Sequence, residues 1–389
     1  MKGVFKHKDE EASRRGPFVP GQGQIPPYLA GRETEQALIR KLFSWLASRQ
    51  PPGSDLLIYG PRGNGKTALM EWARREARGR KIGTLKLSSR EAQSTERLVQ
   101  RLSVLPRWLR SLKELSAGGV KFKKGDPELG RITDALARRA RSHGLVFAID
   151  EVHTLAVDVG QDVLHAVQRL RSEGVPVMLL LAGTPDLPVH LSEMDASFWG
   201  RSRKLALGLL APDAAADAIR VPLEAEGRSI ADKALAQVVA ESHGYPYFLQ
   251  LWGDLLWDAM SETARPASLD DVERVRPLFK TERNTYYRDR YVELERAELD
   301  GVAANLSLAF ADASKRTSRE VNEVIRLALA SEGRGWERTS VIAVRDRLHD
   351  LGYIWSGGGE SRLTFQPGIP SLMRFVARCR DIDLPSERA

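Results

Sequence analysis

The stretch LLIYGPRGNGKTALMEWARREA, residues 56–77, begins as an apolar run, breaks into a glycine-rich turn and continues with helical spacing. Its centre fits the pattern G-x-x-x-x-G-K-[ST] between Gly60 and Thr67. In such a loop the glycines let backbone N–H groups turn inward around phosphate oxygens, and the following helix adds partial positive charge. A chance glycine turn is the alternative, but a strand before the turn and a helix after it are what a phosphate-binding loop (P-loop) requires.

The P-loop pattern predicts individual contacts to a nucleotide. Lys66 is expected to reach the β- and γ-phosphates of ATP, and the Thr67 hydroxyl is expected to ligate Mg²⁺. We predict that the whole loop binds the nucleotide: Gly60, Pro61, Arg62, Gly63, Asn64, Gly65, Lys66, Thr67 and Ala68.

A second motif supplies the acidic residues that ATP hydrolysis needs. The stretch GLVFAIDEVHTL, residues 144–155, is an apolar run typical of a parallel strand buried on both faces, and it leads into Asp150 and Glu151. We interpret Asp150 as a Mg²⁺ ligand, directly or through water, and Glu151 as the base that polarises the attacking water. The alternative is that both only cap the next helix. His153 is interpreted as a loop residue, because no Cys or His cluster lies near it in the sequence.

Length and composition exclude several classes of protein. The 389 residues are enough for two or three domains with a buried core. The longest apolar run, residues 175–182, is far shorter than the roughly 20 residues of a membrane span. Residues 1–16 are charged without an apolar stretch, so we expect no secretory signal. The single cysteine, Cys379, excludes an internal disulfide and suits a reducing cytoplasm, so we expect a cytoplasmic protein with no membrane partner.

The order of the expected elements divides the chain into four parts. Residues 1–24 are polar, and we expect a mobile segment. Residues 25–210 alternate strands with helices, which predicts an α/β core with a parallel sheet wrapped by helices. Residues 211–290 have an all-helical pattern and are interpreted as a helical lid, followed by a C-terminal domain at 291–389. The strands are expected at 55–59, 82–88, 145–149, 176–182 and 204–207.

The C-terminal domain has its own order of elements. Helices are expected at 292–311 and 318–330. A third helix at 339–350 is followed by strands around a glycine-rich turn at 353–366. This order predicts a winged helix-turn-helix, with 339–350 as the recognition helix and 353–366 as the wing. A generic helical cap with a hairpin is the alternative.

From about residue 25 onward the chain resembles a known ATPase family. The matching segments are YLAGRETE (28–35), GPRGNGKT (60–67), FAIDEVHTL (147–155), LLLAGTPDLP (179–188), SFWGRSRKLALGLL (197–210) and HGYPYFLQLWGDLLW (243–257). In that order they resemble the AAA+ branch of origin-recognition and replication-initiator ATPases, with related bacterial and archaeal ATP-binding proteins that neighbour the STAND class. The resemblance implies a P-loop ATPase core, a helical lid and a C-terminal winged helix.

The resemblance also implies roles for residues outside the two motifs. Tyr28 and Leu29 would flank the adenine, and Thr184 would be the polar sensor residue that ends the fourth strand. Arg201 would be the arginine finger that acts on a neighbouring subunit's ATP, which implies a homo-oligomer, and Arg203 is the alternative finger. A threonine that only caps the following turn, and arginines that are solvated or ion-paired, are the competing interpretations.

One segment departs from the family pattern. Many AAA+ lids carry a sensor arginine shortly after the glycine, whereas HGYPYFLQ, residues 243–250, has no arginine. In STAND-like and archaeal relatives a Gly-Tyr-Pro turn occupies this place, so we expect Pro246 to contact the nucleotide. The aromatic residues beside it are equally consistent with ordinary lid packing: Tyr245, Tyr247, Phe248 and Trp252.

Charge bears on nucleic-acid binding. Residues 1–210 hold 35 Lys and Arg against 22 Asp and Glu, whereas residues 291–389 hold 14 against 15. Because phosphate neutralisation dominates affinity for DNA, a near-neutral winged helix weakens the case for DNA there. Residues 88–125 hold nine Lys and Arg against three Glu, and the resemblance implies a DNA-touching insertion at this place; a solvated basic helix face is the alternative. Basic residues that can face DNA from the recognition helix and wing are Arg338, Arg345, Arg347 and Arg362.

Two classes of function are consistent with these patterns. The first is an ATP-driven switch that oligomerises through Arg201 and holds double-stranded DNA through residues 88–125 and the winged helix. The second is an ATPase switch whose winged helix binds a partner protein in a signalling or defence system. Both need ATP and Mg²⁺ at the P-loop.

Overall fold

The computed structural model describes residues 16–21, 25–103, 127–140, 143–260, 265–334, 337–357 and 363–384. The described residues form two compact units. The sheet unit comprises Thr34–Gly60 and Met70–Ala206, and the helical unit comprises the described residues of Met1–Glu33, Pro61–Leu69 and Leu207–Ala389. By its contacts the P-loop therefore belongs to the helical unit, although the strand before it belongs to the sheet unit. The expected mobile segment 1–24 lies almost entirely outside the described residues.

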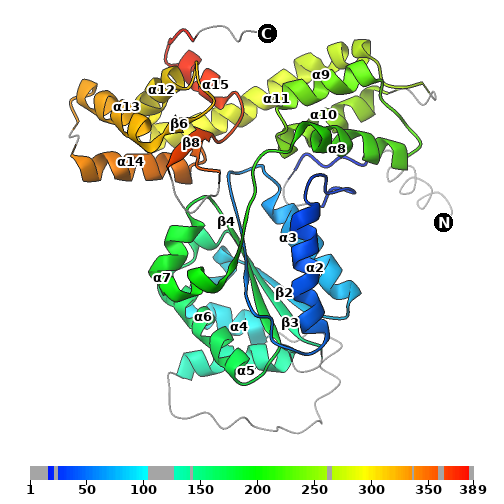
Figure 1. Cartoon of the computed structure of the whole chain (residues 1–389), viewed down its shortest axis with the longest axis vertical. Helices are drawn as coiled ribbons and strands as arrows, with labels where there is room; N and C mark the ends of the chain where they lie inside the picture. The colour runs from blue at the N-terminus through cyan, green and yellow to red at the C-terminus, as the bar shows by residue number, and fades with distance from the viewer. Residues whose placement is uncertain are drawn as a thin grey trace, which may run out of the picture. The chain divides into compact units, whose positions relative to one another are not determined.

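The sheet unit is built on a parallel five-stranded sheet with the order β2-β3-β4-β1-β5 (Figure 1). Every residue of β1 and β4 is buried, as expected of central strands covered on both faces. Each predicted strand is present with its ends shifted by no more than one residue. The strands are β1 (Leu56–Tyr59), β2 (Gly83–Ser88), β3 (Leu145–Asp150), β4 (Val177–Gly183) and β5 (Arg203–Ala206).

Helices cover both faces of this sheet. Right-handed crossovers place the helix between β1 and β2 on one face and the helices of the three later connections on the other. Arg40 of α2 lies over the Trp72 ring of α3, which places α2 on the same face as α3, and Figure 1 shows α6 and α7 across the sheet from them. The helices are α2 (Glu33–Ala47), α3 (Lys66–Gly79), α4 (Thr95–Ser103), α5 (Pro127–Ala140), α6 (Val157–Ser172) and α7 (Leu187–Arg201), with short 3₁₀ turns η1 (Ser89–Ala92) and η3 (Val152–Thr154).

The predicted lid region is helical, with α8 (Pro212–Ala225), α9 (Asp232–Ser242), α10 (Pro246–Ala259) and α11 (Leu269–Arg296). The turn between α9 and α10 needs its glycine. Gly244 has φ +68°, and a Cβ at this position would overlap the Leu210 carbonyl oxygen. Pro246 follows as the first residue of α10, where a missing N–H costs no hydrogen bond.

Helix α11 differs from the prediction at its C-terminal end. It continues without a break past residue 290, the expected lid boundary, and ends at Arg296. The single helix expected at 292–311 is therefore wrong: the chain turns at Glu298, which has φ +54°, and Leu299 is buried before α12 begins. No Gly or Pro marks this turn, so residue type gave no signal for it. The predicted domain boundaries stay a prediction.

The C-terminal block contains three helices, a small antiparallel sheet and a last helix. The helices expected at 318–330 and 339–350 are present, and strands flank the expected wing, whose residues 358–362 lie outside the described part. The sheet has the order β6-β8-β7. The elements are α12 (Asp300–Ala309), β6 (Arg316–Thr317), α13 (Ser318–Ser331), α14 (Arg338–Asp350), β7 (Ile354–Trp355), β8 (Thr364–Pro367) and α15 (Leu372–Cys379).

Two further features of the described residues concern membranes and metals. No helix among them has both the length and the apolar composition needed to cross a bilayer. No group of three or more His, Cys, Asp or Glu side chains among them is placed to hold a metal ion.

Candidate nucleotide-binding site

The P-loop has the backbone conformation that its glycines predict. Gly63 and Gly65 have φ +79° and +84°, a region that favours glycine, and α3 begins directly afterwards at Lys66. The two glycines are needed for different reasons. Gly65 is needed for its φ alone, because a Cβ there would meet nothing within 4 Å and the loop is open at this point. Gly63 is also needed for space, because a Cβ there would overlap the Tyr245 hydroxyl. The open cradle ends at a helix N-terminus whose first turn has no acidic residue, which suits an anion.

Polar contacts hold the P-loop in place. The Asn64 side chain is buried and donates to the Leu207 carbonyl oxygen at 3.0 Å. The buried Arg32 guanidinium donates to the Gly208 carbonyl oxygen at 2.7 Å. It also lies 3.4 Å from the backbone carbonyl oxygen of Asn64. The Lys66 ammonium donates to the Pro61 carbonyl oxygen at 2.8 Å. The loop is thus anchored to residues 207 and 208. The Lys66 side chain lies along the loop, and a phosphate oxygen can replace the Pro61 carbonyl oxygen as its acceptor.

The residues predicted to contact adenine are found beside the lid helices. Tyr28 is partly buried and packs against the core that also contains α10 and α11. Burial and the nearby Glu33 carboxylate raise the pKa of the Tyr28 phenol. Leu29 and Pro246 are partly exposed. Their contact with a nucleotide stays a prediction.

A second set of polar residues lies at the carboxyl edge of the sheet. Asp150 ends β3 and Thr184 follows β4, and these strands are neighbours. The buried Thr184 donates its backbone N–H to Nδ1 of His153 at 3.4 Å, so His153 fixes the turn after β4. Glu151 is exposed with φ +56°, an uncommon conformation for a residue other than glycine. The predicted acidic and sensor residues are therefore brought to one edge.

The sequence did not reveal a group of charged residues that reaches Asp150 through Lys86. The Lys86 ammonium lies 3.3 Å from Asp150 Oδ2 and 2.8 Å from Oε1 of Glu71, which also pairs with Arg74 at 2.7 Å. Burial alone would raise the pKa of Glu71, but hydrogen bonds from Lys86 and Arg74 bring it below its ordinary value. The sequence signal that could have indicated this group is the lysine inside a predicted strand, because a partly buried ammonium needs an acidic partner on a neighbouring element.

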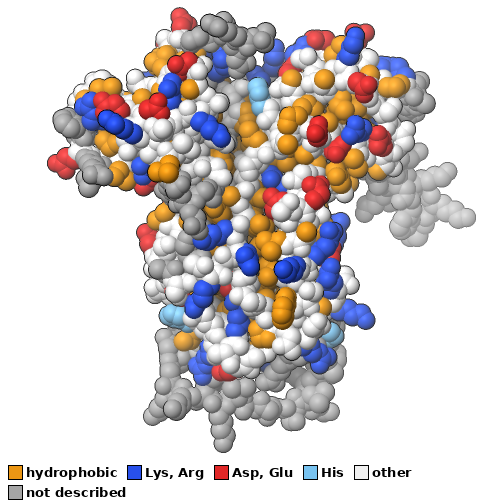
Figure 2. Space-filling model, viewed as in Figure 1, with side chains coloured by type: hydrophobic (Ala, Val, Ile, Leu, Met, Phe, Trp, Pro, Cys, Tyr) orange, Lys and Arg blue, Asp and Glu red, His pale blue; other side chains and the backbone are white. Residues whose placement is uncertain are grey.

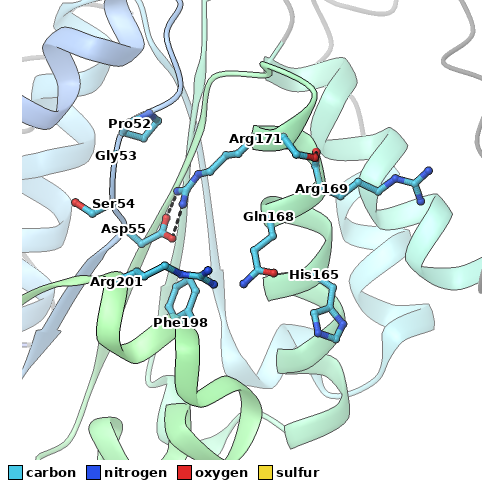
Figure 3. A pocket seen from close by; sticks show the side chains of 11 residues that line it. Pro52, Gly53, Ser54, Asp55, His165, Gln168, Arg169, Arg171, Phe198 and Arg201 are labelled. Atoms are coloured by element: carbon cyan, nitrogen blue, oxygen red, sulfur yellow. Dashed lines mark hydrogen bonds and ion pairs between the residues drawn. The ribbon is translucent and has the colours of Figure 1, made fainter.

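Arg201 lies at the opposite edge of the sheet from Asp150 and Thr184. It ends α7 just before β5 and lines a cavity of about 620 Å³ near the amino ends of β1 and β4 (Figure 3). In the same cavity Asp55 is buried and forms a two-pronged ion pair with Arg171. The Arg201 side chain is exposed and donates to the Ser197 hydroxyl at 3.0 Å. Within one chain, therefore, Arg201 is not placed to act with Thr184.

The basic segment 88–125 is described only to residue 103. Two of its described arginines make local contacts: Arg97 donates to Gln93 at 2.6 Å, and Arg101 lies 3.3 Å from Glu91. Arg90 of η1 is exposed, and the other Lys and Arg of the segment lie outside the described residues. Figure 2 shows Lys and Arg side chains spread over the visible face of the sheet unit, with few acidic ones among them.

The expected basic face of α14 is only partly present. The Arg345 side chain is 13% exposed, pairs with Asp346 at 2.8 Å and lies over the Phe365 ring at 5.7 Å. Arg347 is exposed. The side chain of Arg338 and the whole of Arg362 lie outside what the structure describes. Arg345 therefore does not line an open face together with Arg347, because it packs inside its own domain.

Comparisons with known proteins agree with this geometry. Residues 28–180 match the family model described as an AAA ATPase domain. The Walker-type ATPase of Pyrococcus abyssi is 14% identical and superposes with a TM-score of 0.62, covering 90% of this chain and 96% of that one. The ORC2 protein of Aeropyrum pernix, solved with ADPNP and ADP, is 15% identical with a TM-score of 0.57, covering 92% and 96%. No protein with a curated description is significantly similar to the chain in sequence.

The sheet order, the P-loop conformation and these matches agree on the fold. The likeness to the two archaeal structures extends over nine-tenths of the chain. Residues 28–180 match the AAA ATPase domain model, and the chain shares the P-loop NTPase fold of the two archaeal ATPase structures.

Proposed function

We propose that this protein is a Mg²⁺-dependent ATPase that works as a nucleotide-controlled switch. The observation that carries the proposal is the open P-loop cradle between β1 and the N-terminus of α3. When nucleotide binds, the Lys66 ammonium leaves the Pro61 carbonyl oxygen and donates to the β- and γ-phosphates instead. Backbone N–H groups of the loop bind the remaining phosphate oxygens. The ORC2 protein of Aeropyrum pernix, with its ADPNP and ADP, supports the same kind of ligand here.

The carboxyl edge of the sheet supplies the groups for hydrolysis. Thr67 and Asp150 would hold Mg²⁺, which when bound neutralises phosphate charge. Glu151 accepts a proton from the attacking water, and Thr184 orients the water or the γ-phosphate. A phosphate-release assay with purified protein tests this: ATP is hydrolysed only when Mg²⁺ is added, and Lys66→Ala is inactive. Hydrolysis that is equal in Lys66→Ala would mean that another site is responsible.

We infer that ATP joins subunits into a homo-oligomer. The support is the position of Arg201, which lies at the edge of the sheet away from Asp150 and so serves as a finger only on a neighbouring subunit's ATP. Arg203 stays the alternative finger, because it is exposed at the start of β5.

We further propose that the assembly associates with double-stranded DNA. The excess of Lys and Arg in residues 1–210, and the nine basic residues of 88–125, supply the positive charge that phosphate binding requires. The C-terminal block, which we interpret as a winged helix, adds a second contact through the exposed Arg347.

A second function is supported by the C-terminal block: binding of a partner protein in a signalling or defence system. Its charge is close to neutral and Arg345 is turned inward. Between α12 and α13 it has an apolar pocket of about 410 Å³, lined by Leu306, Ala309, Val321 and Val324, with charged side chains at its border.

Salt dependence separates the two functions. Binding to random duplex DNA that needs ATP and weakens steeply as salt is raised supports the first, because counterion release drives such binding. If nucleotide-saturated protein ignores duplex DNA even at low salt, the DNA function is wrong and the partner-protein function remains.

A further inference from the structure

Tyrosine and acidic side chains of the lid and α11 meet the apex of the P-loop. The Tyr245 hydroxyl donates to the Arg62 carbonyl oxygen at 2.6 Å, and the Tyr286 hydroxyl lies 2.8 Å from that of Tyr245. The Glu293 carboxylate lies 2.7 Å from the Arg62 guanidinium. We call Tyr245, Tyr286 and Glu293 the P-loop clamp. All of these residues belong to the helical unit.

The direction of the two hydroxyl hydrogen bonds follows from chemistry. A carbonyl oxygen only accepts, so the single proton of Tyr245 is used on Arg62, and Tyr286 must donate to Tyr245. Tyr245 is fully buried, and burial raises the pKa of both phenols above the ordinary value. Both hydroxyls therefore keep their protons at neutral pH, and the chain of hydrogen bonds from α11 to the loop is complete.

The hydrogen bond on Arg62 fixes the orientation of the next N–H group. A trans peptide is planar, with its C=O and N–H pointing in opposite directions. The described chain has no cis peptide, so holding the Arg62 carbonyl toward Tyr245 aims the Gly63 N–H away from the lid. An inward N–H at this position of a P-loop is a phosphate donor. Tyr245 thus prepares a donor for the phosphate without touching the nucleotide itself.

Helix α11 links this clamp to the C-terminal block. Tyr286, Arg290 and Glu293 are spaced by four and three residues and share one face, on which Arg290 pairs with Glu293 at 3.1 Å. The adjacent face of the same helix carries Tyr287, whose hydroxyl donates to the Pro370 carbonyl oxygen at 2.6 Å. Its ring lies 5.6 Å from that of Phe375 in α15. One continuous helix therefore contacts the P-loop apex and the C-terminal block.

We propose that the P-loop clamp positions the Arg62–Gly63 peptide for a nucleotide phosphate, and that α11 carries the nucleotide state from the P-loop to the C-terminal block. Tyr245 and Tyr286 are positioning residues in this scheme, and Glu293 is the residue through which α11 senses movement of Arg62. The proposal rests on nucleotide binding at the P-loop. It gives the lid a way to sense nucleotide although the segment HGYPYFLQ has no arginine.

Removal of single hydroxyls tests the positioning role. ADP affinity is measured by calorimetry for Tyr245→Phe, Tyr286→Phe and the double variant, together with each variant's melting temperature without nucleotide. One lost hydrogen bond weakens ADP binding about fivefold in Tyr245→Phe. The double variant is no weaker than Tyr245→Phe, because the hydroxyls act in series. Tyr247→Phe is the matched control, because it also removes one tyrosine hydroxyl and the Tyr247 ring stacks on that of Tyr286 at 4.9 Å. This variant should leave the ADP affinity unchanged.

The affinities separate failure of this proposal from failure of the proposed function. If the wild type binds ADP and Tyr245→Phe binds it equally well while melting at a lower temperature, Tyr245 is only structural and the positioning role is wrong. If the wild type itself binds no ADP, the proposed function fails first.

Hydrogen exchange tests the link through α11. Added ADP is expected to change amide exchange in residues 286–296 and 372–379 of the wild type. Glu293→Gln, compared at a concentration of ADP that calorimetry shows to be saturating, loses that change because Arg62 no longer has its charged partner on α11. Glu295→Gln, an exposed glutamate on the same helix, keeps the change. Exchange in α11 that stays the same when ADP is shown to bind, or that responds equally in Glu293→Gln, would overturn the link.

Discussion

The Lys86 ammonium lies 3.3 Å from the Asp150 carboxylate, the group that we expect to hold Mg²⁺. Lys86 stands on β2 and Asp150 ends β3, and the two strands pair in register. Its second contact, to Glu71, leaves the lysine between two carboxylates. If Asp150 holds Mg²⁺ as proposed, we expect this positive charge to compete with the metal ion for the same oxygen.

The first prediction concerns this competition. Lys86→Met should lower the Mg²⁺ concentration for half-maximal ATP hydrolysis about two- to fivefold, the worth of one partly exposed ion pair. Titration of Mg²⁺ at saturating ATP measures it. Lys41→Met, which removes an exposed lysine on α2, should leave the midpoint where it is. A higher midpoint in Lys86→Met would show that the lysine supports the metal site instead of competing with it.

Glu151→Gln should separate binding from turnover. The amide keeps the size of the side chain but cannot accept the proton of water, so hydrolysis should fall roughly a hundredfold or more. ADP and ATP affinities, measured by calorimetry, should stay near those of the wild type because Glu151 does not belong to the P-loop. Normal turnover in this variant would show that another group is the base.

Mixing inactive variants tests whether Arg201 acts between subunits. Lys66→Ala lacks the nucleotide site but keeps Arg201, whereas Arg201→Ala keeps the site but lacks the finger. Each should be inactive alone, and a mixture should recover part of the ATPase rate because the first donates its arginine to the second. Arg203→Ala serves as the comparison. Full activity of Arg201→Ala together with loss in Arg203→Ala would move the finger to Arg203.

The start of α11 gives a prediction for stability and pH. Asp271 is 1% exposed and accepts hydrogen bonds from Ser268 and from Arg265, the latter at 2.6 Å. The Arg265 hydrogen bond holds the pKa of Asp271 well below its usual range. A lowered folded-state pKa stabilises the protein above the unfolded value of about 3.9, and this contribution is lost as pH falls through the folded value.

Asp271→Asn should therefore lower the free energy of unfolding by about 2 kcal/mol at neutral pH, as for hydrogen bonds to a charged group. The difference from the wild type should stay constant down to about pH 5 and shrink below about pH 3.9. Urea unfolding followed by circular dichroism measures it. Asp270→Asn, an exposed neighbour in the first turn, should have a smaller effect. A difference that grows as pH falls would contradict the assigned pKa.

The sheet and the P-loop could be predicted because their signals are local. The central strands β1, β3 and β4 are apolar runs, and Gly63 and Gly65 are required by the loop in which they stand. The end of α11 was not predictable in this way, since Glu298 adopts φ +54° without a glycine or proline to mark it. Tertiary packing of the buried Leu299 decides that turn.

The contacts that the sequence did not reveal join residues far apart in the chain. Lys86 and Asp150 meet because β2 and β3 are neighbours, which strand order alone determines. Tyr245 was interpreted as possible lid core, and its bond to Arg62 spans 183 residues. Arg345 was expected on an open face, and only the position of Phe365 shows why it turns inward. A local sequence can indicate that such a residue needs a partner, but it does not identify the partner.

Calorimetric titration of ADP with Mg²⁺ into the wild type and into Lys66→Ala is the most direct test of the P-loop as a nucleotide site. We predict saturable binding of one ADP per chain in the wild type, and none in Lys66→Ala despite an unchanged circular dichroism spectrum. Wild-type protein that is folded and still shows no affinity for ADP or ATP in the presence of Mg²⁺ would contradict the central claim.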